Sequence, residues 1–284
     1  MTELTMIGLG LMGAGLAMRV RAHGHSMTVW NRTPGKMQAF VEGGAEGARN
    51  LADAVRASPV VAICVADYAV TREIFDDADV EAALSGRIVA QLSTGTPDEA
   101  AASAEWFRNR GARYLDGAVL GGPKSLDSDY ARVILAGAEV DFRDAEAVLG
   151  DMCRKITHVG ENVRAASVLD LGWLSRQYGM FIGVTHGVAA CEAEGVSLDR
   201  LVEVMPAGEY AREYVKKIHQ ASFDDTAATL RTWAMAFRLF TRQAADSGIS
   251  DEFPRLMASW FERALDAGYG DEDVSALIKI FRGS

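Results

Sequence analysis

Short apolar runs alternate with amphipathic stretches through the first half of the chain. Five short apolar runs bounded by turn residues predict β-strands, at residues 4–9, 27–30, 60–65, 88–92 and 113–118. The stretches that separate or follow them predict helices, at residues 12–22, 34–42, 50–57, 69–75 and 97–109. Two more runs, at 133–136 and 156–159, predict strands around a helix at 141–149. Because strands and helices alternate, we expect a parallel sheet covered by helices on both faces.

Two of the predicted helices begin with a threonine that is followed by a proline. Thr33 precedes Pro34, and Thr96 precedes Pro97. Proline is favoured at the first helical position, and a threonine hydroxyl can cap the free N–H groups there. We therefore expect both threonines to be N-caps.

The second half of the chain predicts helices alone. After about Gly160 no strand pattern recurs, and residues 163–193 predict one helix, about 45 Å long at about 1.5 Å per residue. Gly179, Gly183 and Gly187 recur within it every four residues and form a strip of small residues along one face. Each glycine costs a helix up to about 1 kcal/mol. The strip therefore indicates close approach of another helix, or else a chance recurrence in a glycine-rich chain.

Composition and charge exclude several classes of protein. The 284 residues include 29 Lys and Arg against 39 Asp and Glu, a net charge of −10, and 49% of them are hydrophobic. A nucleic-acid-binding protein needs a basic face for phosphates, so we expect no nucleic-acid partner. The most apolar long segment is interrupted by Asp170, Arg176 and His186, which argues against a membrane span.

The three cysteines, Cys64, Cys153 and Cys191, lie far apart and match neither a disulfide framework nor a metal-binding spacing. We interpret them as small core residues. The five histidines form no metal spacing either, so no metal site is expected. The N-terminus shows no signal-peptide pattern, and a reducing, cytoplasmic setting is the expectation.

A glycine-rich loop joins the first predicted strand to the first predicted helix. Its glycines permit a tight turn, a close approach of the backbone to a pyrophosphate, and packing of the helix on the strand. We therefore expect an α/β, Rossmann-like domain that binds a dinucleotide over residues 1–160. A long inter-domain helix at 161–193 then leads to an all-α C-terminal domain for substrate binding and dimerisation, 194–284. The loop reads Gly8-Leu9-Gly10-Leu11-Met12-Gly13.

The end of the second predicted strand indicates which dinucleotide binds. NAD-binding sites usually carry a carboxylate there for the ribose 2′-hydroxyl. This chain has Asn31-Arg32-Thr33 instead, with Lys36 one turn further along. A guanidinium pairs with a 2′-phosphate, and Asn and Thr side chains can donate hydrogen bonds to it. We therefore expect NADPH, with a solvated surface role for Arg32 as the alternative.

Two loops after later strands are expected to border the nicotinamide. Val65 and Ala66 follow the third predicted strand, and Ser93 and Thr94 follow the fourth. Ligands of open α/β sheets bind at this edge of the sheet. We interpret Asp67 as the cap of the helix that follows it.

Several segments together resemble one superfamily. The glycine loop, the segment Asn31-Arg32-Thr33-Pro34 and the segment Asp116-Gly117-Ala118-Val119 are similar to the β-hydroxyacid dehydrogenase superfamily. The stretch AGYGDED, from Ala267 to Asp273, is similar to its NADPH-dependent imine reductase branch, which includes the reductive aminases. The resemblance covers essentially the whole chain.

The start of the long helix separates this branch from the dehydrogenases. The resemblance implies that a hydroxyacid dehydrogenase has a lysine there and a serine in the loop after the Asp116 strand. Imine reductases place an aspartate or tyrosine at the position of Asp170, and reductive aminases add a tyrosine where Tyr178 lies. This chain reads Arg164-Ala165-Ala166-Ser167-Val168-Leu169-Asp170 in the helix and Leu120-Gly121-Gly122 in the loop.

By this resemblance Asp170 and Tyr178 are the candidate catalytic residues. Eight residues turn a helix about 80° beyond two full turns, so that both side chains can line one cleft. A carboxylate stabilises an iminium ion, or protonates a neutral imine if burial raises its pKa. The alternatives are an Asp170 paired with a nearby cation and a Tyr178 that only packs.

The resemblance also implies substrate-pocket residues and an oligomer. Gln91 stands where reductive aminases have an asparagine. The sequence therefore does not decide whether the protein catalyses imine formation in addition to imine reduction. Trp233 matches a pocket position of the family, with a place in the helical core as the alternative, and Leu120 lies in the loop after the Asp116 strand. The family implies a homodimer with intertwined C-terminal helices, in which each cleft joins domains of both subunits.

Three functions compete at this point. The first is NADPH-dependent reduction of a small-molecule imine, cyclic or preformed, or of a carbonyl and an amine combined. The second is a hydroxyacid-type dehydrogenase that uses NADP, against which the absent lysine and serine argue. The third is a non-catalytic protein that binds NADPH without turnover.

Overall fold

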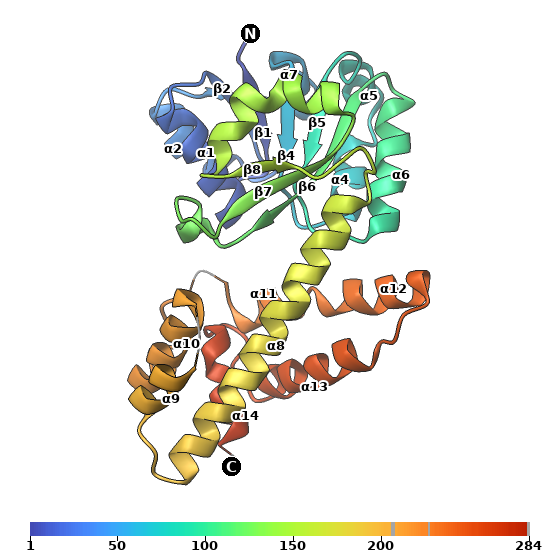
Figure 1. Ribbon diagram of the computed structural model, residues 1–284. Coiled ribbons are helices and arrows are strands. Elements are labelled where there is room, and N and C mark those ends of the chain that lie inside the picture. Colours follow the sequence, from blue (N-terminus) through green and yellow to red (C-terminus); the bar gives the residue numbers. More distant parts are fainter. Residues whose placement is uncertain (206–207, 227, 283–284) are drawn as a thin grey trace. The chain divides into compact units, whose positions relative to one another are not determined.

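The computed structural model describes residues 1–205, 208–226 and 228–282, and the chain divides into two compact units. The first unit is Met1–Asp170 and the second is Leu171–Ser284. The boundary falls inside helix α8 (Ala165–Ala193), so the first turns of this helix belong to the first unit. Figure 1 shows that one unit contains a sheet and that the other is helical.

An eight-stranded sheet forms the centre of the first unit (Figure 1), in the order β3-β2-β1-β4-β5-β6-β7-β8. Its first six members have the strand order of dinucleotide-binding sheets, whose ligands bind at the carboxyl edge. The strands are β1 (Leu4–Ile7), β2 (Met27–Trp30), β3 (Glu46–Gly47), β4 (Val60–Ile63), β5 (Ile88–Gln91), β6 (Arg113–Leu120), β7 (Arg132–Gly137) and β8 (Ile156–His158).

Helices cover both faces of this sheet, as the sequence predicts. They are α1 (Leu11–Ala22), η1 (Pro34–Met37), α2 (Gln38–Glu42), α3 (Leu51–Ala57), α4 (Tyr68–Phe75), α5 (Ala78–Ala83), α6 (Pro97–Arg108), η2 (Pro123–Ser125), α7 (Glu139–Leu149) and η3 (Gly150–Met152). Successive strand residues point to opposite faces. Met6 therefore packs with Leu16 of α1 in one apolar cluster, whereas Ile7 packs with Phe107 of α6 in another.

The sheet is mixed, which corrects the expectation of a parallel sheet. Strands β6 and β7 run antiparallel, with Asp116 opposite Ala136. A parallel pair needs a crossover connection of about a dozen residues or more, usually a helix. The link at 121–131 contains only η2, so the chain turns back instead. Strand β3 and helix α5 were not predicted because, at 2 and 6 residues, they are too short to show a repeat of hydrophobic positions.

The two threonine–proline pairs behave differently. Thr96 caps α6 as predicted, because its hydroxyl accepts a hydrogen bond from the Glu99 N–H at 3.2 Å. The Glu99 carboxylate in turn accepts from the Thr96 N–H at 2.9 Å, which completes a capping box. Thr33 makes no side-chain cap bond, and the 3₁₀ turn η1 follows it before α2 begins. Thr33 therefore occupies the N-cap position before Pro34, as predicted, but its hydroxyl does not make the expected cap bond.

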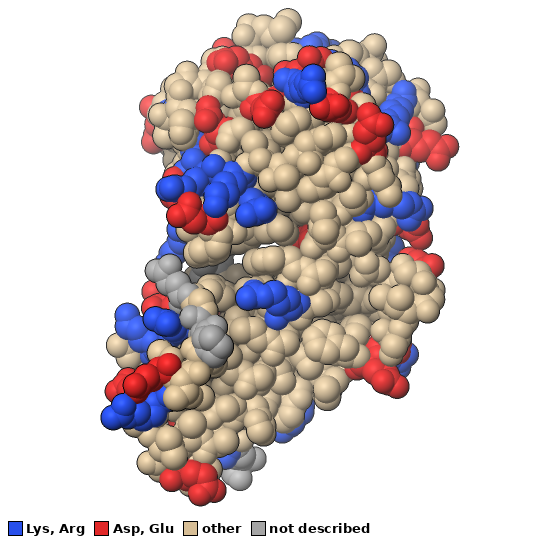
Figure 2. Space-filling model, viewed as in Figure 1, with Lys and Arg blue, Asp and Glu red and all other residues tan. Residues whose placement is uncertain are grey.

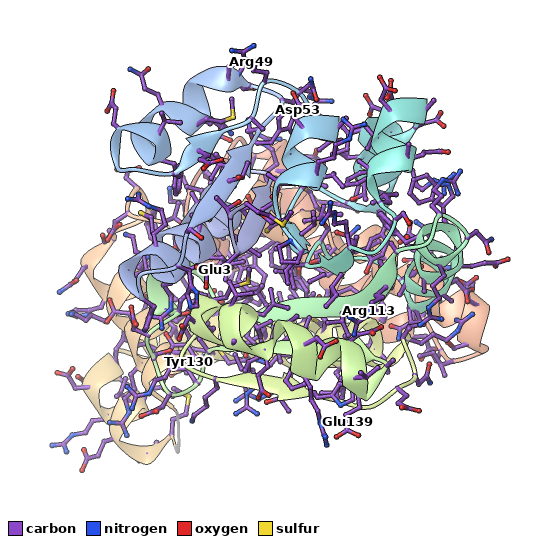
Figure 3. All side chains as sticks on the ribbon, turned by 90° about the horizontal axis from the view of Figure 1, so that it is seen from above. Glu3, Arg49, Asp53, Arg113, Tyr130 and Glu139 are labelled. Carbon is purple, nitrogen blue, oxygen red and sulfur yellow. The ribbon has the colours of Figure 1, made fainter. Side chains whose placement is uncertain are left out.

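Strand β6 is anchored to α7 by a charged side chain. Arg113, at the start of β6, donates to the carboxylates of Asp141 and Asp144, each at 2.6 Å. Figure 3 shows Arg113 beside α7, whose first residue is Glu139. Acidic and basic side chains are interspersed over the face of the molecule that Figure 2 shows, so the charge on that face is of mixed sign.

The second unit contains only helices among its described residues, apart from one isolated bridge. Helix α8 is 29 residues long, close to the prediction. No helix of the described residues is both long and apolar enough to cross a membrane. The other helices are α9 (Leu198–Val204), α10 (Glu209–Gln220), α11 (Leu230–Ala234), α12 (Phe237–Ser247), α13 (Glu252–Asp266), η4 (Val274–Leu277) and α14 (Ile278–Phe281).

The glycine strip on α8 is not filled by another helix of the same chain. A Cβ atom added at Gly183 would meet no atom within 4 Å. At Gly179 and Gly187 the nearest atoms belong to the side chains of Phe253, at 3.6 Å, and Leu201, at 4.0 Å. The predicted close approach of another helix backbone is therefore absent within the described residues of this unit.

Candidate active site

The glycine loop has the backbone geometry that a dinucleotide requires. Gly8 has φ +93°, and a Cβ atom there would collide with the backbone carbonyl of Cys64. A Cβ atom on Gly13 would collide with the carbonyl of Gly8, so this glycine lets α1 lie against the loop. A Cβ atom on Gly10 would meet nothing within 4 Å, so the loop faces open space where a phosphate can approach.

The N-terminus of α1 provides the anion-binding groups of this loop. Gly10 precedes the helix, and no side chain caps the first N–H groups, which carry partial positive charge. Leu9 is buried in the core, Leu11 is 74% exposed, and Met12 is half-buried against the core. These three residues contribute backbone groups and packing, and the geometry fits a bound pyrophosphate.

Asn31 connects the glycine loop to the end of β2. Its Oδ1 accepts a hydrogen bond from the Leu9 N–H at 2.9 Å, and its Nδ2 donates to the Thr33 carbonyl at 3.0 Å. In this structure the amide thus holds two backbone segments together, whereas the sequence suggested that it donates to a phosphate.

The cations after β2 are exposed, as a 2′-phosphate site requires. The guanidinium of Arg32 is 70% exposed and lies 3.5 Å from the Glu73 carboxylate, a weak surface ion pair. Thr33 and Lys36 are exposed beside it. No carboxylate occupies residues 31–33, so the residues present fit an adenosine ribose that carries a 2′-phosphate better than one that carries a hydroxyl.

The two loops after β4 and β5 are joined by a buried hydrogen-bond network. The Ser93 Oγ accepts from the Val65 N–H at 3.1 Å and donates to the Gln91 Oε1 at 3.2 Å. The Gln91 Nε2 donates to the Thr71 hydroxyl at 2.9 Å. Gln91 is fully buried, and both ends of its amide are engaged within the first unit. Its expected contact with substrate stays a prediction.

The other predicted members of these loops lie at the surface or cap a helix. Ala66 is exposed and Thr94 is half-buried. Asp67 caps α4, as expected, by accepting a hydrogen bond from the Val70 N–H at 2.8 Å. Leu120 ends β6 and is 9% exposed.

A buried carboxylate that the sequence did not single out for function lies in the middle of β6. Asp116 is fully buried, and its Oδ1 accepts a hydrogen bond from the Tyr68 hydroxyl at 2.5 Å. The Tyr114 hydroxyl donates to the same oxygen at 3.2 Å. The Ser167 hydroxyl, from the first turn of α8, donates to the Oδ2 at 2.9 Å. No spacing in the sequence reveals this cluster, since it joins α4, β6 and α8.

Asp170 lies one turn along α8 from Ser167 and is 4% exposed. Burial raises the pKa of the Asp170 carboxyl to about 7, the charge of Asp116 raises it as well, and a hydrogen bond with Thr94 lowers it. Burial also raises the pKa of Asp116 to about 7, although the donated hydrogen bonds lower it. Neither carboxylate forms an ion pair with a described residue, so the alternative of a cation-paired Asp170 has no support.

Tyr178 and Trp233 lie together in the core of the second unit. The Tyr178 hydroxyl donates to the Trp233 carbonyl at 2.5 Å, and Tyr178 is 1% exposed. The two rings are 5.6 Å apart in a T-shaped arrangement, and Phe181 and Phe237 complete the cluster around Tyr178. Both residues pack as core aromatics in this structure, and their catalytic and pocket roles stay predictions.

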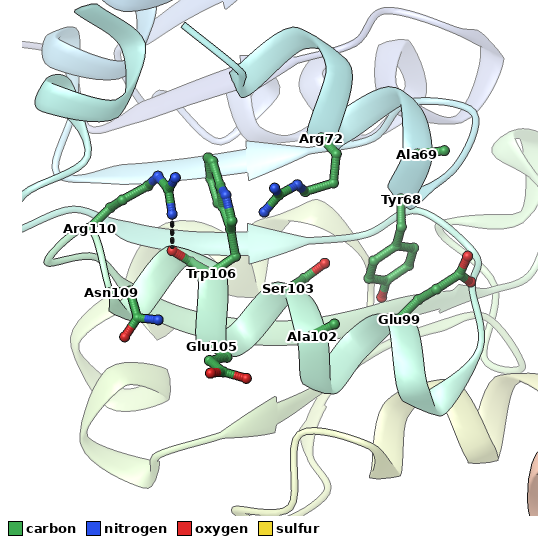
Figure 4. Close-up of a pocket in the computed structure, with 10 residues that line it drawn as sticks. All are labelled: Tyr68, Ala69, Arg72, Glu99, Ala102, Ser103, Glu105, Trp106, Asn109 and Arg110. Carbon is green, nitrogen blue, oxygen red and sulfur yellow. Dashed lines mark hydrogen bonds between the residues drawn. The ribbon is translucent and has the colours of Figure 1, made fainter. Parts of the chain in front are cut away.

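A cavity of about 490 Å³ lies between α4 and α6 in the first unit, and none of the predicted site residues lines it. Figure 4 shows the ring of Trp106 between Arg110 and Arg72, whose guanidinium carbons lie 3.7 and 4.2 Å from the ring centre. Tyr68 and Glu99 lie at the other end. Among the described residues, no group of three or more His, Cys, Asp or Glu could hold a metal ion.

These features define a class of protein. A glycine loop at the carboxyl edge of the sheet, with exposed cations after β2, is typical of Rossmann-type domains that bind NADP(H). The buried carboxyls of Asp116 on β6 and of Asp170 at the start of α8 add candidate acid–base groups to such a domain.

Comparison with known proteins narrows the class to a family. Residues 3–160 match the NAD binding domain of 6-phosphogluconate dehydrogenase, and residues 162–283 match the NADPH-dependent reductive aminase-like C-terminal domain. An NADPH-dependent reductive aminase of Aspergillus oryzae is 27% identical, over 99% of this chain and 97% of its own. The chain belongs to the family of NADPH-dependent imine reductases and reductive aminases, as its resemblance implied.

Solved structures agree with this assignment. An imine reductase from Myxococcus stipitatus in complex with NADP+ has a TM-score of 0.68 and 28% identity, covering 98% of this chain and 99% of that chain. A reductive aminase from Aspergillus terreus in complex with NADPH and ethyl levulinate has a TM-score of 0.65 and 30% identity, covering 99% of each chain. The expected fold, a Rossmann-like domain followed by a helical domain, is confirmed.

Proposed function

We propose that the protein is an NADPH-dependent oxidoreductase that reduces the C=N bond of a small-molecule imine or iminium ion to an amine. The observation that carries the proposal is the buried, cation-free carboxyl of Asp170 at the start of α8. An iminium ion is already positive, so an anionic group stabilises it, whereas a neutral imine needs a proton donor before hydride transfer. A lysine at this position would repel the iminium ion. The family membership supports the same reaction.

The first unit provides the groups that would hold the cofactor. The N–H groups at the start of α1 would hold the pyrophosphate, and Arg32 and Lys36 would pair with the 2′-phosphate. When bound, NADPH supplies a hydride at C4 of the nicotinamide. The backbone of the Val65 and Ser93 loops, held together by their buried hydrogen bonds, gives the nicotinamide half a fixed border.

Asp170 is the proposed acid–base group. With a pKa raised to about 7, a protonated carboxyl is present at neutral pH and donates its proton to the nitrogen of a neutral imine. Protonation makes the carbon more electrophilic, and the carboxylate that remains stabilises the positive charge until hydride arrives. In all, imine, NADPH and one proton give amine and NADP+.

We further propose that preformed imines are the main substrates. Supporting this, the amide of Gln91 is engaged at both ends and the Tyr178 hydroxyl is bonded to Trp233. The Tyr178 hydroxyl proton is donated to a carbonyl, and one N–H of Gln91 is donated to Thr71, which leaves fewer donors to activate a carbonyl for attack by an amine. Because reductive aminases are among the relatives, the coupling of a carbonyl with an amine is the second activity to measure.

A homodimer with intertwined C-terminal helices is part of the proposal. It is supported by the unfilled space at Gly183 on α8 and by exposed apolar side chains on the second unit, such as Ile249, Phe253 and Leu256. All three cysteines are free, which fits the cytoplasmic location that we propose.

The test is a spectrophotometric assay of NADPH oxidation with cyclic imines and with ketone and amine mixtures. Hydroxyacids with NADP+ are assayed in parallel. We expect turnover of cyclic imines, and at least a tenfold lower kcat for Asp170→Asn with unchanged NADPH affinity. Turnover of hydroxyacids alone would establish a dehydrogenase. Tight NADPH binding with no turnover of any substrate would establish a binding protein.

A further inference from the structure

The surroundings of Asp116 form a cage of neutral hydrogen-bond donors. Tyr68 comes from α4, Tyr114 from β6 itself and Ser167 from α8, and all three hydroxyls donate to its two oxygens. Burial and the nearby carboxylate raise the pKa of both tyrosines well above 10, so they stay protonated and keep donating. Three donated hydrogen bonds stabilise a negative charge on Asp116.

Asp170 has a much poorer set of partners than Asp116. It is three residues beyond Ser167, and residues at this spacing are neighbours on one face of a helix. Among the described residues, the side-chain hydrogen bond that affects its pKa is with Thr94, from the loop after β5. A carboxyl that is buried with one donor is more stable with its proton than without it.

Ser167, whose hydroxyl donates to Asp116, lies one turn before Asp170 on α8 and so brings the two carboxyls into the same part of the fold. The charge of Asp116 raises the pKa of Asp170. The elements packed around the pair contribute hydroxyl groups, and no Lys, Arg or His of the described residues makes an ion pair with either carboxylate. Without a cation to compensate them, two negative charges in a buried site repel strongly, so the pair titrates in two separated steps.

We propose that Asp116 and Asp170 work as one unit with a single negative charge, in which Asp116 holds the charge and Asp170 keeps the proton that catalysis uses. Asp116 is then a positioning residue: its three donors fix where the charge lies, and its charge keeps Asp170 protonated. The shared charge of the pair does not depend on the proposed imine reductase function, and only the catalytic step rests on it. In that step the proton moves from an Asp170 oxygen to the imine nitrogen, and solvent returns a proton afterwards.

The proton transfer itself gains from this arrangement. Once Asp170 has given up its proton, the pair carries two negative charges next to a newly formed iminium ion. Attraction between the doubly charged pair and the cation stabilises the protonated substrate while hydride arrives. After reduction the neutral amine no longer compensates the second charge, and the pair takes up a proton again.

The first experiment compares the pH dependence of kcat for the wild type, Asp116→Asn and Asp141→Asn. Asp141 is the matched control, because it is also a buried aspartate of the first unit but pairs with Arg113. In the wild type, kcat is expected to fall at high pH as Asp170 loses its proton, and the pKa of this fall defines the basic limb of the profile. Removal of the charge at 116 is expected to lower that pKa by about one unit, an ordinary size for two interacting carboxylates. That shift makes kcat about tenfold lower on the basic side, whereas near pH 5 it stays close to wild type. Asp141→Asn is expected to leave the limb unmoved.

The second experiment reads the carboxyl groups without any turnover. Difference infrared spectroscopy follows their protonation in the substrate-free protein as pH changes. In the wild type we expect two protonation steps. Their midpoints should be further apart in pH than the midpoint of the single step in Asp116→Asn is from that in Asp170→Asn. The single step of Asp170→Asn, which reports Asp116, is expected at the lower pH. If Asp116→Asn does not fold, this variant alone locates the charge, because its step must coincide with the lower wild-type step when Asp116 ionises first.

Two outcomes overturn the proposal. One is a pair of wild-type steps that coincide with the midpoints of the two variants, which means that the charges do not interact. The other is a lower midpoint for Asp116→Asn than for Asp170→Asn, which places the charge on Asp170. If the infrared titration behaves as expected but no imine is reduced, the pair stands and the proposed function fails.

Discussion

At the scale of single residues, burial without a cationic partner controls the charge of Asp170. Its folded-state pKa of about 7 lies above the ordinary aspartate value of 3.8. Between these values the folded protein binds more protons at this site than the unfolded chain does. The free energy of unfolding therefore falls as pH rises from about 4 through 7. A salt-bridged aspartate behaves in the opposite way, because its contribution to the free energy of unfolding is lost as pH falls.

A stability measurement tests this sign. Asparagine has nearly the same shape as aspartic acid and carries no charge. Asp170→Asn is therefore expected to match the wild type in acid and to become the more stable protein as pH rises. The difference in unfolding free energy is expected to grow by about 2 kcal/mol between pH 5 and pH 8. Urea unfolding at the two pH values measures it, and a difference that stays constant with pH contradicts the raised pKa.

Arg32 is the residue expected to decide between the two dinucleotides. A charge-assisted hydrogen bond to a phosphate contributes roughly 1.5–3 kcal/mol, which corresponds to about a tenfold change or more in binding. Arg32→Ala is therefore expected to raise the KM for NADPH at least tenfold and to leave that for NADH within about twofold. Arg143→Ala, an exposed arginine of α7, is the matched control and is expected to change neither constant. Equal effects on both cofactors would place Arg32 away from the 2′-phosphate.

At the scale of elements, the start of α6 shows how one sequence signal produces two results. Both Thr33 and Thr96 precede proline, but only Thr96 has a glutamate three residues later. That glutamate completes the capping box of α6, whereas Thr33 leads into a 3₁₀ turn. The cap matters for function because α6 follows the loop that carries Ser93 and Thr94.

The two threonines give a matched pair of variants. Thr96→Ala removes the cap of α6 and is expected to lower the free energy of unfolding by about 1 kcal/mol. Thr33→Ala removes no cap bond and is expected to lower it by less than about 0.5 kcal/mol. Denaturant unfolding without cofactor measures both. Equal losses in the two variants would show that the capping box contributes nothing specific.

At the scale of the whole molecule, the surface of α8 is the feature that a single chain leaves unexplained. Glycine is an unfavourable helix residue, yet Gly183 is exposed and no atom of the described residues fills the space beside it. A second copy of the chain would use this space, because small residues let two helices approach closely.

Sedimentation equilibrium tests the proposed dimer. The wild type is expected to be a dimer at micromolar concentration, and Gly183→Trp is expected to be a monomer with normal helix content. Lys216→Trp, on the exposed side of α10, is the control and is expected to remain a dimer. A wild type that sediments as a monomer refutes the intertwined arrangement.

Local chemistry along the chain was enough to predict much of the fold. The runs that became β1, β2, β4 and β5 are short and mostly apolar, and the glycine loop, the Asp67 cap and the long helix α8 depend on neighbours in sequence. The glycine loop and Arg32 identified the dinucleotide class because phosphate binding at a helix start needs specific residues close together in the chain. The resemblance to the imine reductase branch, with Asp170 and no lysine at the start of the long helix, pointed to imine chemistry.

Only the tertiary structure decided the features that join distant segments. The antiparallel turn from β6 to β7, the closed network around Gln91 and the packing of Tyr178 on Trp233 all depend on contacts that no local pattern encodes. The clearest case is Asp116, whose donors come from α4, β6 and α8 and whose burial raises the pKa of its carboxyl. A pKa depends on what surrounds a group in space, and those surroundings exist only once the chain has folded.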